Sequence, residues 1–312
     1  MSKVLITGSG GFIGGELVNQ LNRIGINPYI LKYTQNSNQG TPTTKTSIKN
    51  REISWEAFRD WPLQKKDQWV IFHCGGISNY RHSNKRDLYL ANVERTQMLL
   101  EKFNYPQNLM VFMSTIGVYD RPFLKYSKEK LTTNSKLSPK SSYGKSKILA
   151  EQSIIKSTMS YHILRLGWIY GKNMRKDSHI RVMFKWQKEK RLISKILWTG
   201  RVSVGEIESL GKKLVEIFLH FKGQKIEVIE NYADKDPVAL SSLVSSLENK
   251  KIFQIPVWLK TISPLFPSKL RILIEPNYLV FEDNQGGEVN FNAKIIECRK
   301  SWSKESGNHW RK

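Results

Sequence analysis

Short apolar runs alternate with longer amphipathic stretches through the first half of the chain. The apolar runs predict five β-strands, at residues 4–7, 28–32, 69–73, 109–114 and 162–166. The stretches 83–104 and 141–157 carry apolar residues at the three- and four-residue spacing of a helix with one buried face. Strands that alternate with helices are typical of a parallel sheet covered by helices. We therefore expect an α/β fold built on a doubly wound parallel sheet.

A glycine-rich segment follows the first predicted strand. Residues 4–14 have the sequence VLITGSGGFIG, and an apolar helical pattern continues from Phe12 to Leu21. A strand, a tight glycine turn and a helix N-terminus in that order direct backbone N–H groups and the positive end of the helix dipole toward a bound pyrophosphate. The segment predicts a Rossmann-type dinucleotide site, with contacts expected from Gly8, Gly10, Gly11, Phe12, Ile13 and Gly14.

The second part of the chain has a less regular pattern. After Tyr170 the clearest helical signal lies at 212–221, and residues 252–281 form an apolar stretch that contains several prolines. A chain of 312 residues is long enough for a nucleotide-binding domain and a smaller lobe. We expect a Rossmann domain over residues 1–170, with sheet elements continuing to roughly residue 222, and a substrate-binding lobe mainly over 171–312.

A second motif, YGKSK from Tyr143 to Lys147, lies at the start of a predicted helix. Positions four apart share one helix face, so both of these side chains can point toward one ligand. A nearby ammonium favours the phenolate, so we expect Lys147 to lower the pKa of Tyr143 and suit it to proton transfer. Ser114 and Thr115 end a predicted strand at the carboxyl edge of the sheet, where a hydroxyl can hold the oxygen that the tyrosine protonates.

These motifs together resemble an extended short-chain dehydrogenase/reductase, in the branch of NAD(P)-dependent nucleotide-sugar epimerases, dehydratases and reductases. The resemblance covers roughly residues 1–215, through TGSGGFIG at 7–14, HCGG at 73–76, Asn92-Val93, Ser114-Thr115, YGKSK at 143–147 and RLGWIYG at 165–171. It implies that Thr115, Tyr143 and Lys147 are catalytic, that Thr115 and Tyr143 contact the substrate, and that the substrate is a nucleotide-diphosphate sugar. The Asp-Glu pair of the similar 4,6-dehydratases is replaced by Ile116-Gly117, which cannot perform their elimination.

The resemblance also implies further contacts with the dinucleotide. They are expected from Lys32, Cys74, Gly75, Gly76, Asn92, Tyr143, Lys147, Trp168 and Ile169. A structural role is favoured for Asn92, and the side chains of His73 and Cys74 are expected to pack rather than to catalyse. Lys32 stands where the family often has an acidic residue for the ribose hydroxyls, and a lysine there would pair with a 2′-phosphate. NADP(H) is therefore favoured, with NAD(H) left open.

Two features favour net reduction of a keto sugar. NADPH is generally kept reduced in cells, and RLGWIYG is similar to the RTSWVYG of 4-keto deoxysugar reductases, whereas many epimerases of this branch have Asn at the position of Trp168. The alternative within the class is an NAD-dependent nucleotide-sugar 4-epimerase. An alternative of another class is a non-catalytic dinucleotide-binding scaffold with a basic partner surface. The combination of Thr115, Tyr143 and Lys147 favours an enzyme over a scaffold.

The chain is strongly basic, with 50 Lys and Arg against 27 Asp and Glu and a formal net charge of +23. Such a charge attracts nucleotide diphosphates, nucleic acid and anionic lipid alike. Arg175, Lys176 and Arg201 are candidates for the substrate diphosphate from position and charge alone. No recognised motif accompanies the charge, so nucleic acid is not expected as a partner. We expect residues 252–281 to form the core of the small lobe, and contact of this stretch with an anionic membrane is the less favoured alternative.

Cysteine use and the absence of targeting signals bear on the location of the protein. Cys74 and Cys298 are far apart and lack metal-ligand spacing, so neither a disulfide framework nor a metal site is expected. The sequence shows no signal-peptide pattern at its start, and no run of about eighteen apolar residues that would predict a membrane span. We therefore expect a cytoplasmic protein, and the family resemblance allows a homodimer.

Overall fold

The computed structural model describes residues 2–32, 51–77, 84–119, 130–189, 196–197, 200–244, 253–254, 265, 280–283 and 285–307. Most of the apolar stretch 252–281, with its alternatives of lobe core or membrane contact, lies outside the described residues. The chain divides into two compact units, each assembled from separate segments. The first comprises Met1–Asp120, Pro139–Arg165 and Leu210–Glu230, and the second comprises Arg121–Ser138, Leu166–Ser209 and Asn231–Lys312.

A seven-stranded sheet with the order β11-β6-β5-β4-β1-β2-β3 forms the centre of the first unit. Its strands are β1 (Lys3–Thr7), β2 (Tyr29–Lys32), β3 (Glu52–Ser54), β4 (Trp69–His73), β5 (Leu109–Thr115), β6 (Ser160–Leu166) and β11 (Glu227–Tyr232). The pairs that join β3, β2, β1, β4 and β5 are parallel. The five predicted strands and the doubly wound parallel sheet are confirmed. The strand order reverses between β1 and β4, and such a switch point leaves a ligand crevice at the carboxyl ends of the strands.

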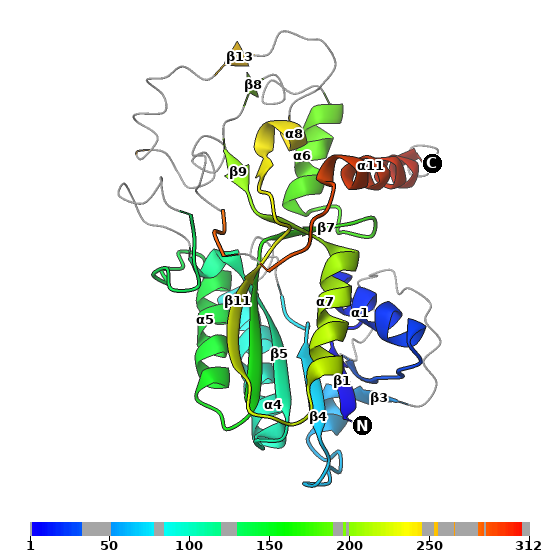
Figure 1. Cartoon of the computed structure of the whole chain (residues 1–312), viewed down its shortest axis with the longest axis vertical. Helices are drawn as coiled ribbons and strands as arrows, with labels where there is room; N and C mark the ends of the chain where they lie inside the picture. The colour runs from blue at the N-terminus through cyan, green and yellow to red at the C-terminus, as the bar shows by residue number, and fades with distance from the viewer. Residues whose placement is uncertain are drawn as a thin grey trace. The chain divides into compact units, whose positions relative to one another are not determined.

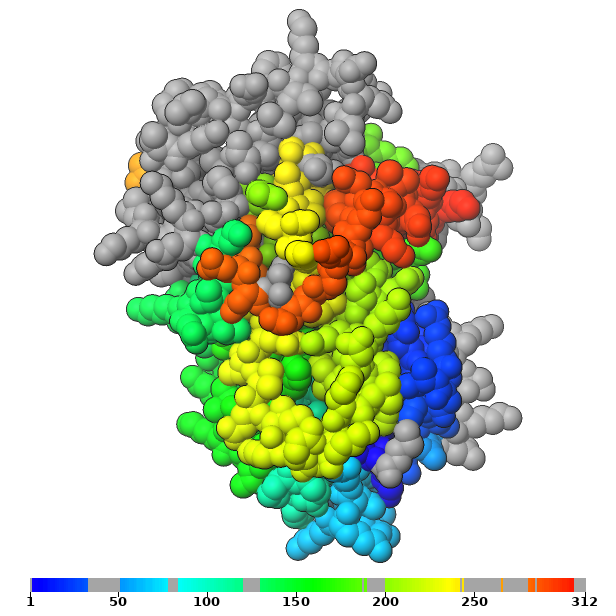
Figure 2. Space-filling model, in the orientation of Figure 1, coloured from blue at the N-terminus to red at the C-terminus, as the bar shows by residue number. Residues whose placement is uncertain are grey.

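Helices cover both faces of this sheet, with α4 and α5 on one side and α1 and α7 on the other (Figure 1). Their bounds are α1 (Phe12–Arg23), α4 (Arg95–Phe103), α5 (Ser142–Ile155) and α7 (Ile207–His220). Figure 2 shows the blue surface of α1 beside the yellow-green surface of α7. At Gly211 of α7, an added Cβ would lie 3.0 Å from side-chain atoms of both Gln20 and Glu16 of α1. The absence of a side chain at this glycine therefore lets the two helices pack closely.

The opposite face of the sheet packs on a core rich in aromatic residues. The short helix α2 (Trp55–Phe58) contributes both of its aromatic side chains to this core, to which Trp69 of β4 and Phe103 of α4 also belong. Phe58 lies with its ring centroid 6.0 Å from that of Phe103, and Trp69 lies 5.5 Å from Phe103. Burial of such large apolar side chains is the main stabilising contribution to a sheet domain of this kind.

The helix predicted over residues 83–104 contains an irregular turn. The structure has α3 (Lys85–Tyr89), a π-helical turn η1 (Leu90–Glu94) and α4 in direct succession. The π-turn widens the helix by one residue, so it changes which side chains face the sheet, and it buries Ala91, Asn92 and Val93. Single π-turns inside α-helices occur frequently at functional sites.

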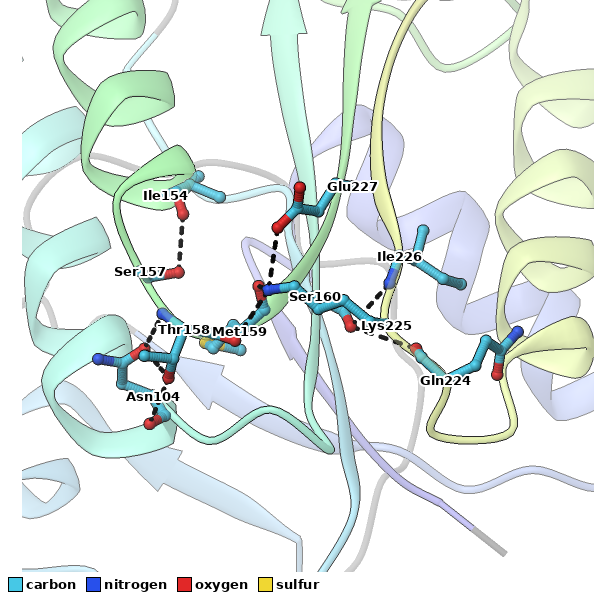
Figure 3. A network of polar contacts seen from close by, with 10 residues as sticks. All are labelled: Asn104, Ile154, Ser157, Thr158, Met159, Ser160, Gln224, Lys225, Ile226 and Glu227. Atoms are coloured by element: carbon cyan, nitrogen blue, oxygen red, sulfur yellow. Dashed lines mark hydrogen bonds and ion pairs between the residues drawn. The ribbon is translucent and has the colours of Figure 1, made fainter.

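Polar contacts fix the turns at the amino-terminal edge of β6 and β11, the edge away from the switch-point crevice (Figure 3). Thr158 donates its backbone N–H to Asn104 Oδ1 at 2.7 Å, and Ser160 Oγ accepts from Ile226 N–H at 3.0 Å. Lys225 Nζ donates to the carbonyl oxygens of Thr158 at 3.0 Å and Met159 at 2.9 Å. These bonds hold the ends of α4 and α5 against the start of β11. They lie at the end of the sheet opposite the carboxyl ends of the strands, where a ligand is expected.

The second unit contains short strand pairs and three described helices. The pairs are β7 (Trp168–Tyr170) with β10 (Val204–Glu206), β9 (Arg201–Val202) with β12 (Val238–Ala239), and β8 (Ile196–Leu197) with β13 (Phe253–Gln254). The helices are α6 (His179–Lys188), α8 (Leu240–Val244) and α11 (Phe291–Gly307), drawn green, yellow and red in Figure 1. Arg181 joins α6 to α11, because its Nη2 lies 2.9 Å from Glu305 Oε2 and its guanidinium lies over the ring of Trp302. Across the described residues, none of the helices is both long and apolar enough to cross a membrane.

Candidate active site

The glycine segment lies at the switch point between β1 and β4. Gly8, Gly11 and Gly14 of this segment, together with Gly75 after β4, form the glycine cradle. Gly8 has φ +70°, which is unfavourable for any residue with a side chain, and an added Cβ would lie 2.6 Å from Gly75 Cα. A Cβ at Gly14 would collide with the carbonyl oxygen of Gly8. Gly11 N–H donates to this same oxygen at 2.9 Å. The loop after β1, the loop after β4 and the first turn of α1 therefore approach as closely as glycines permit.

The N-terminus of α1 at this cradle fits the pyrophosphate of a dinucleotide. Its N-cap, Gly11, offers no side-chain acceptor, and the first turn carries no acidic residue that would repel an anion. Phe12 and Ile13 are the first two residues of the helix, and the position of an added Cβ at Gly10 has no other atom within 4 Å. Open space therefore lies beside Gly10, just before the N-terminus of α1.

Lys32 ends β2 and forms an ion pair with Glu52 of the neighbouring strand β3. About half of the Lys32 side chain is exposed. The sequence suggested that Lys32 pairs with a 2′-phosphate, but in the structure the Glu52 carboxylate lies beside its ammonium group. Any phosphate at this place would also meet the negative charge of Glu52.

Thr115 and Tyr143 are brought together by a close approach of α5 to the turn after β5. Thr115 is the last residue of β5, and Tyr143 lies in the first turn of α5, whose N-cap Ser141 accepts from Gly144 N–H at 3.0 Å. An added Cβ at Gly144 would lie 2.6 Å from the carbonyl oxygen of Gly117. The glycine inside the YGKSK motif therefore allows the contact in which the hydroxyl groups of Tyr143 and Thr115 share a hydrogen bond.

The predicted lowering of the Tyr143 pKa by Lys147 is wrong. Burial raises the pKa of Tyr143 to about 12, and only the hydrogen bond from Thr115 acts in the opposite direction. Lys147 Nζ instead donates to the carbonyl oxygen of Met113 at 2.8 Å and lies 4.4 Å from the ring centroid of Phe112. Burial lowers the pKa of Lys147 to about 8. Tyr143 is therefore protonated at neutral pH.

Sequence reasoning missed a buried ion pair one helical turn beyond Lys147. Glu151 accepts from Arg165 Nη2 of β6 at 2.9 Å and also accepts a short hydrogen bond from Ser114 Oγ. Arg165 Nη1 donates to Tyr119 Oη at 2.8 Å. Burial alone would lower the pKa of Arg165, but its contacts with Glu151 raise it. The four-residue spacing of Lys147 and Glu151 was visible in the sequence, whereas the pairing with Arg165 depends on the fold.

The loop after β4 places Cys74, Gly75 and Gly76 at the same edge. Burial raises the pKa of the Cys74 thiol to about 12, so this thiol is not a nucleophile at neutral pH. Asn92 on the π-turn accepts from Ile77 N–H at 2.9 Å and donates to Ile77 O at 3.1 Å and to Ser146 Oγ at 3.0 Å. Its amide thus holds protein groups, and its predicted contact with the dinucleotide stays a prediction.

The remaining candidate residues belong to the second unit. Trp168 and Ile169 lie on β7, and the Trp168 ring stacks on His179 with the ring centroids 5.0 Å apart. Arg175 forms a two-bond ion pair with Asp177, Arg201 Nη2 donates to Pro237 O at 2.9 Å, and Lys176 is exposed. Their expected roles toward cofactor and substrate stay predictions. Within the described ranges, His, Cys, Asp and Glu form no group of three that could hold a metal ion.

The fold and this site define an extended short-chain dehydrogenase/reductase. The family model described as the RmlD substrate binding domain matches residues 2–198, and the chain belongs to this family. An uncharacterized UDP-glucose epimerase from Bacillus subtilis is 31% identical over 195 residues, which are 56% of this chain and 59% of the relative. A UDP-glucose 4-epimerase from Yersinia pestis is 32% identical over 165 residues, which are 48% of this chain and 46% of the relative.

Solved structures share the fold over nearly the whole chain. UDP-glucuronic acid 4-epimerase from Bacillus cereus, solved with UDP-glucuronic acid and NAD, superposes with a TM-score of 0.68 at 17% identity, covering 97% of this chain and 99% of that one. In sequence, by contrast, the chain spans about half the length of the curated relatives it matches.

Proposed function

We propose that the protein is an epimerase of UDP-activated sugars that uses a bound nicotinamide dinucleotide. The observation that carries this proposal is the hydrogen-bonded pair of Thr115 and Tyr143, with buried Lys147 one helical turn away. Curated relatives named as UDP-glucose 4-epimerases support the epimerase alternative over the keto-sugar reduction that the sequence favoured. The glycine cradle beside the pair supports a dinucleotide-dependent reaction.

The chemistry is a reversible oxidation at one carbon of the sugar. The bound dinucleotide supplies the acceptor and later the donor of the hydride. Tyr143 acts here as the phenolate, after its own proton has passed to solvent. Its Oη would take the proton of the sugar hydroxyl as the C–H bond breaks, and it would return this proton when hydride is delivered to the opposite face of the ketone. Thr115 Oγ1 donates a hydrogen bond to the same oxygen and stabilises its charge. No reducing equivalent is consumed over the cycle.

The proposal takes NAD as the dinucleotide, with NADP as the alternative. The NADP preference rested on Lys32, whose ammonium group pairs with Glu52. A 2′-phosphate there would gain the attraction of Lys32 but would also be repelled by the Glu52 carboxylate. The NAD in the solved complex of the Bacillus cereus epimerase supports the same choice.

The Tyr143→Phe variant tests the proposed proton transfer. Loss of the hydroxyl should lower kcat for interconversion of UDP-glucose and its 4-epimer by about 10²- to 10⁴-fold, the usual contribution of a positioned acid–base group. Dinucleotide affinity should stay within a factor of about three, because the cradle is unchanged. Product formation is followed by NMR of the sugar signals, and affinity by fluorescence titration.

Tyr89→Phe is the matched control, because Tyr89 is an exposed tyrosine of α3. This variant should behave as the wild type in both measurements. If Tyr143→Phe kept wild-type turnover, Tyr143 could not be the acid–base group, and the proposed function would lose its central residue.

A further inference from the structure

His73 is a buried imidazole that the proposed chemistry does not use. It ends β4 in the middle of the sheet, paired in register with Thr7 of β1 and Phe112 of β5, and only 1% of its surface is exposed. Its Nδ1 lies 2.6 Å from Thr7 Oγ1, and its Nε2 lies 3.0 Å from Thr96 Oγ1. Both ring nitrogens of His73 are therefore hydrogen-bonded, although the sequence predicted a packing role.

The partners of these hydroxyl groups determine the tautomer. Thr96 Oγ1 donates its one proton to the carbonyl oxygen of Asn92 at 2.8 Å, so it can only accept from His73, and Nε2 must carry the proton. At the other nitrogen, Thr7 Oγ1 accepts from Gly75 N–H at 2.9 Å and directs its own proton to Nδ1. The neutral Nε2–H form of His73 satisfies every donor and acceptor in this series.

The surroundings also keep this ring uncharged. Burial lowers the pKa of His73 to about 3, and the positive charges of Lys147 and Arg95 act in the same direction. A protonated ring would place a hydrogen on Nδ1 in front of the Thr7 hydroxyl, which would then have to turn its own proton elsewhere. His73 is therefore uncharged at neutral pH.

The hydrogen bonds continue from His73 to the catalytic helix. Thr96 and Asn92 lie four residues apart, at the junction of the π-turn and α4. Asn92 Nδ2 donates to Ser146 Oγ at 3.0 Å, and Ser146 Oγ donates to the carbonyl oxygen of Tyr143 at 2.8 Å. One series of contacts thus connects the backbone of the dinucleotide cradle, at Gly75, with the residue that carries the reactive hydroxyl.

We infer that His73 is a positioning residue, held as the neutral Nε2–H tautomer, that couples the cradle at Thr7 and Gly75 to the helix turn carrying Tyr143 through Thr96, Asn92 and Ser146. This inference rests on the proposed function for its kinetic readout only. Its spectroscopic and binding readouts do not require turnover, so a failure of the inference and a failure of the proposed function are distinguishable.

The tautomer is tested on the full chain labelled with ¹⁵N-histidine. Long-range ¹H–¹⁵N spectra should show one histidine with a protonated Nε2 and an unprotonated Nδ1, unchanged between pH 5 and 9 and absent from the His73→Gln variant. A His73 signal with the proton on Nδ1, or one that titrates near the usual value of about 6.5, overturns the inference.

The coupling is tested by removing one bond at a time. His73→Phe keeps a ring but removes both bonds, and it should weaken NADH binding by about tenfold and lower kcat by a similar factor. His73→Gln places an amide donor near Thr96 and should recover part of both losses. A residue that only fills space would change the melting temperature without changing binding or kcat, so a folded His73→Phe variant with wild-type values of both overturns the inference.

Two further variants complete this experiment. His220→Gln is the control, because His220 is exposed on α7 and its ring contacts the carbonyl oxygen of Glu216 on the same helix. It should match the wild type. If His73→Phe does not fold, Thr96→Val removes the partner of Nε2 with little change of volume, and the same loss of binding and kcat is expected. Wild-type values for a folded Thr96→Val variant would contradict the coupling.

Discussion

The residues proposed to be catalytic are buried, and burial changes their acidity. Tyr143 has its pKa raised to about 12, and Lys147 has its pKa lowered to about 8, in both cases mainly by burial. Each residue is thus shifted toward its neutral form. Proton transfer by Tyr143 in the proposed reaction therefore requires that its hydroxyl first lose its proton.

A buried ion pair between Glu151 and Arg165 lies next to the candidate site. Glu151 lies four residues after Lys147 on α5 and contacts both Arg165 of β6 and Ser114 of β5. The Glu151→Gln variant leaves the Arg165 charge buried and uncompensated, so the free energy of unfolding should fall by about 3 kcal/mol or more. Denaturant unfolding followed by tryptophan fluorescence measures this loss.

Two comparisons decide whether the charge itself is responsible. Glu101→Gln changes an exposed carboxylate on α4 and should alter the unfolding free energy by less than about 0.5 kcal/mol. The double variant Glu151→Met with Arg165→Met removes both charges. Its unfolding free energy should fall by less than the sum of the losses in the single variants Glu151→Met and Arg165→Met. A Glu151→Gln variant as stable as the wild type would show that the Glu151–Arg165 pair contributes no net stability.

At the scale of elements, the central strands were predictable because each is a short apolar run between turn residues. The edge strands β3 and β11 were not predicted. β3 has only three residues, and Glu227 and Glu230 interrupt the apolar run of β11, as an edge position tolerates. Hydrophobic pattern therefore identifies buried strands well and edge strands poorly.

In the candidate site, too, features set by short motifs could be predicted, and contacts between distant residues could not. The glycine cradle, Thr115, Tyr143 and Lys147 were predictable because each belongs to a short motif with a backbone requirement or a fixed helical spacing. The contacts of His73 and Glu151 were not predictable from the sequence. The hydrogen-bond partners of His73 lie at least 23 residues away along the chain, and those of Glu151 lie at least 14 residues away. The π-turn that contains Asn92 could not be predicted from the sequence either, because hydrophobic periodicity alone does not indicate an inserted residue.

At the scale of the whole molecule, the chain alternates between its two compact units. The chain enters the second unit at Arg121 and again at Leu166, and residues 210–230 return to the first unit. The second unit pairs strands of two or three residues, which are too short to leave a periodic signal in the sequence. This explains why the sequence pattern became irregular after Tyr170, where the residues that would choose a particular sugar were expected.

The second unit contains a buried acidic group that should make stability depend on pH. Burial is the main cause that raises the pKa of Asp234 to about 7, with a further contribution from the charge of Glu206. Between pH 4 and 7 the folded protein therefore keeps a proton that the unfolded chain has lost, and the stability that this proton provides disappears as pH rises through 7. The unfolding free energy should fall by up to about 1.4 kcal/mol per pH unit in this window.

The Asp234→Asn variant should remove this dependence. An amide resembles the protonated acid and can still accept from Glu206 N–H and meet Tyr170 Oη. The variant should be more stable than the wild type at pH 8 and similar to it at pH 5, as measured by denaturant unfolding at each pH. Asp60→Asn, at an exposed position, should keep the wild-type profile. Parallel profiles for the wild type and Asp234→Asn would show that Asp234 titrates normally.

The proposed epimerisation interconverts two sugar nucleotides without net redox change. The measurement that tests it most directly is NMR of UDP-glucose or UDP-glucuronic acid incubated with the full chain and a trace of NAD. We predict that either 4-epimer of one pair gives the same final mixture and that no reduced dinucleotide accumulates or is consumed. Consumption of one reduced dinucleotide per sugar converted, or a sugar left unchanged while the same protein binds NAD tightly, would contradict the account.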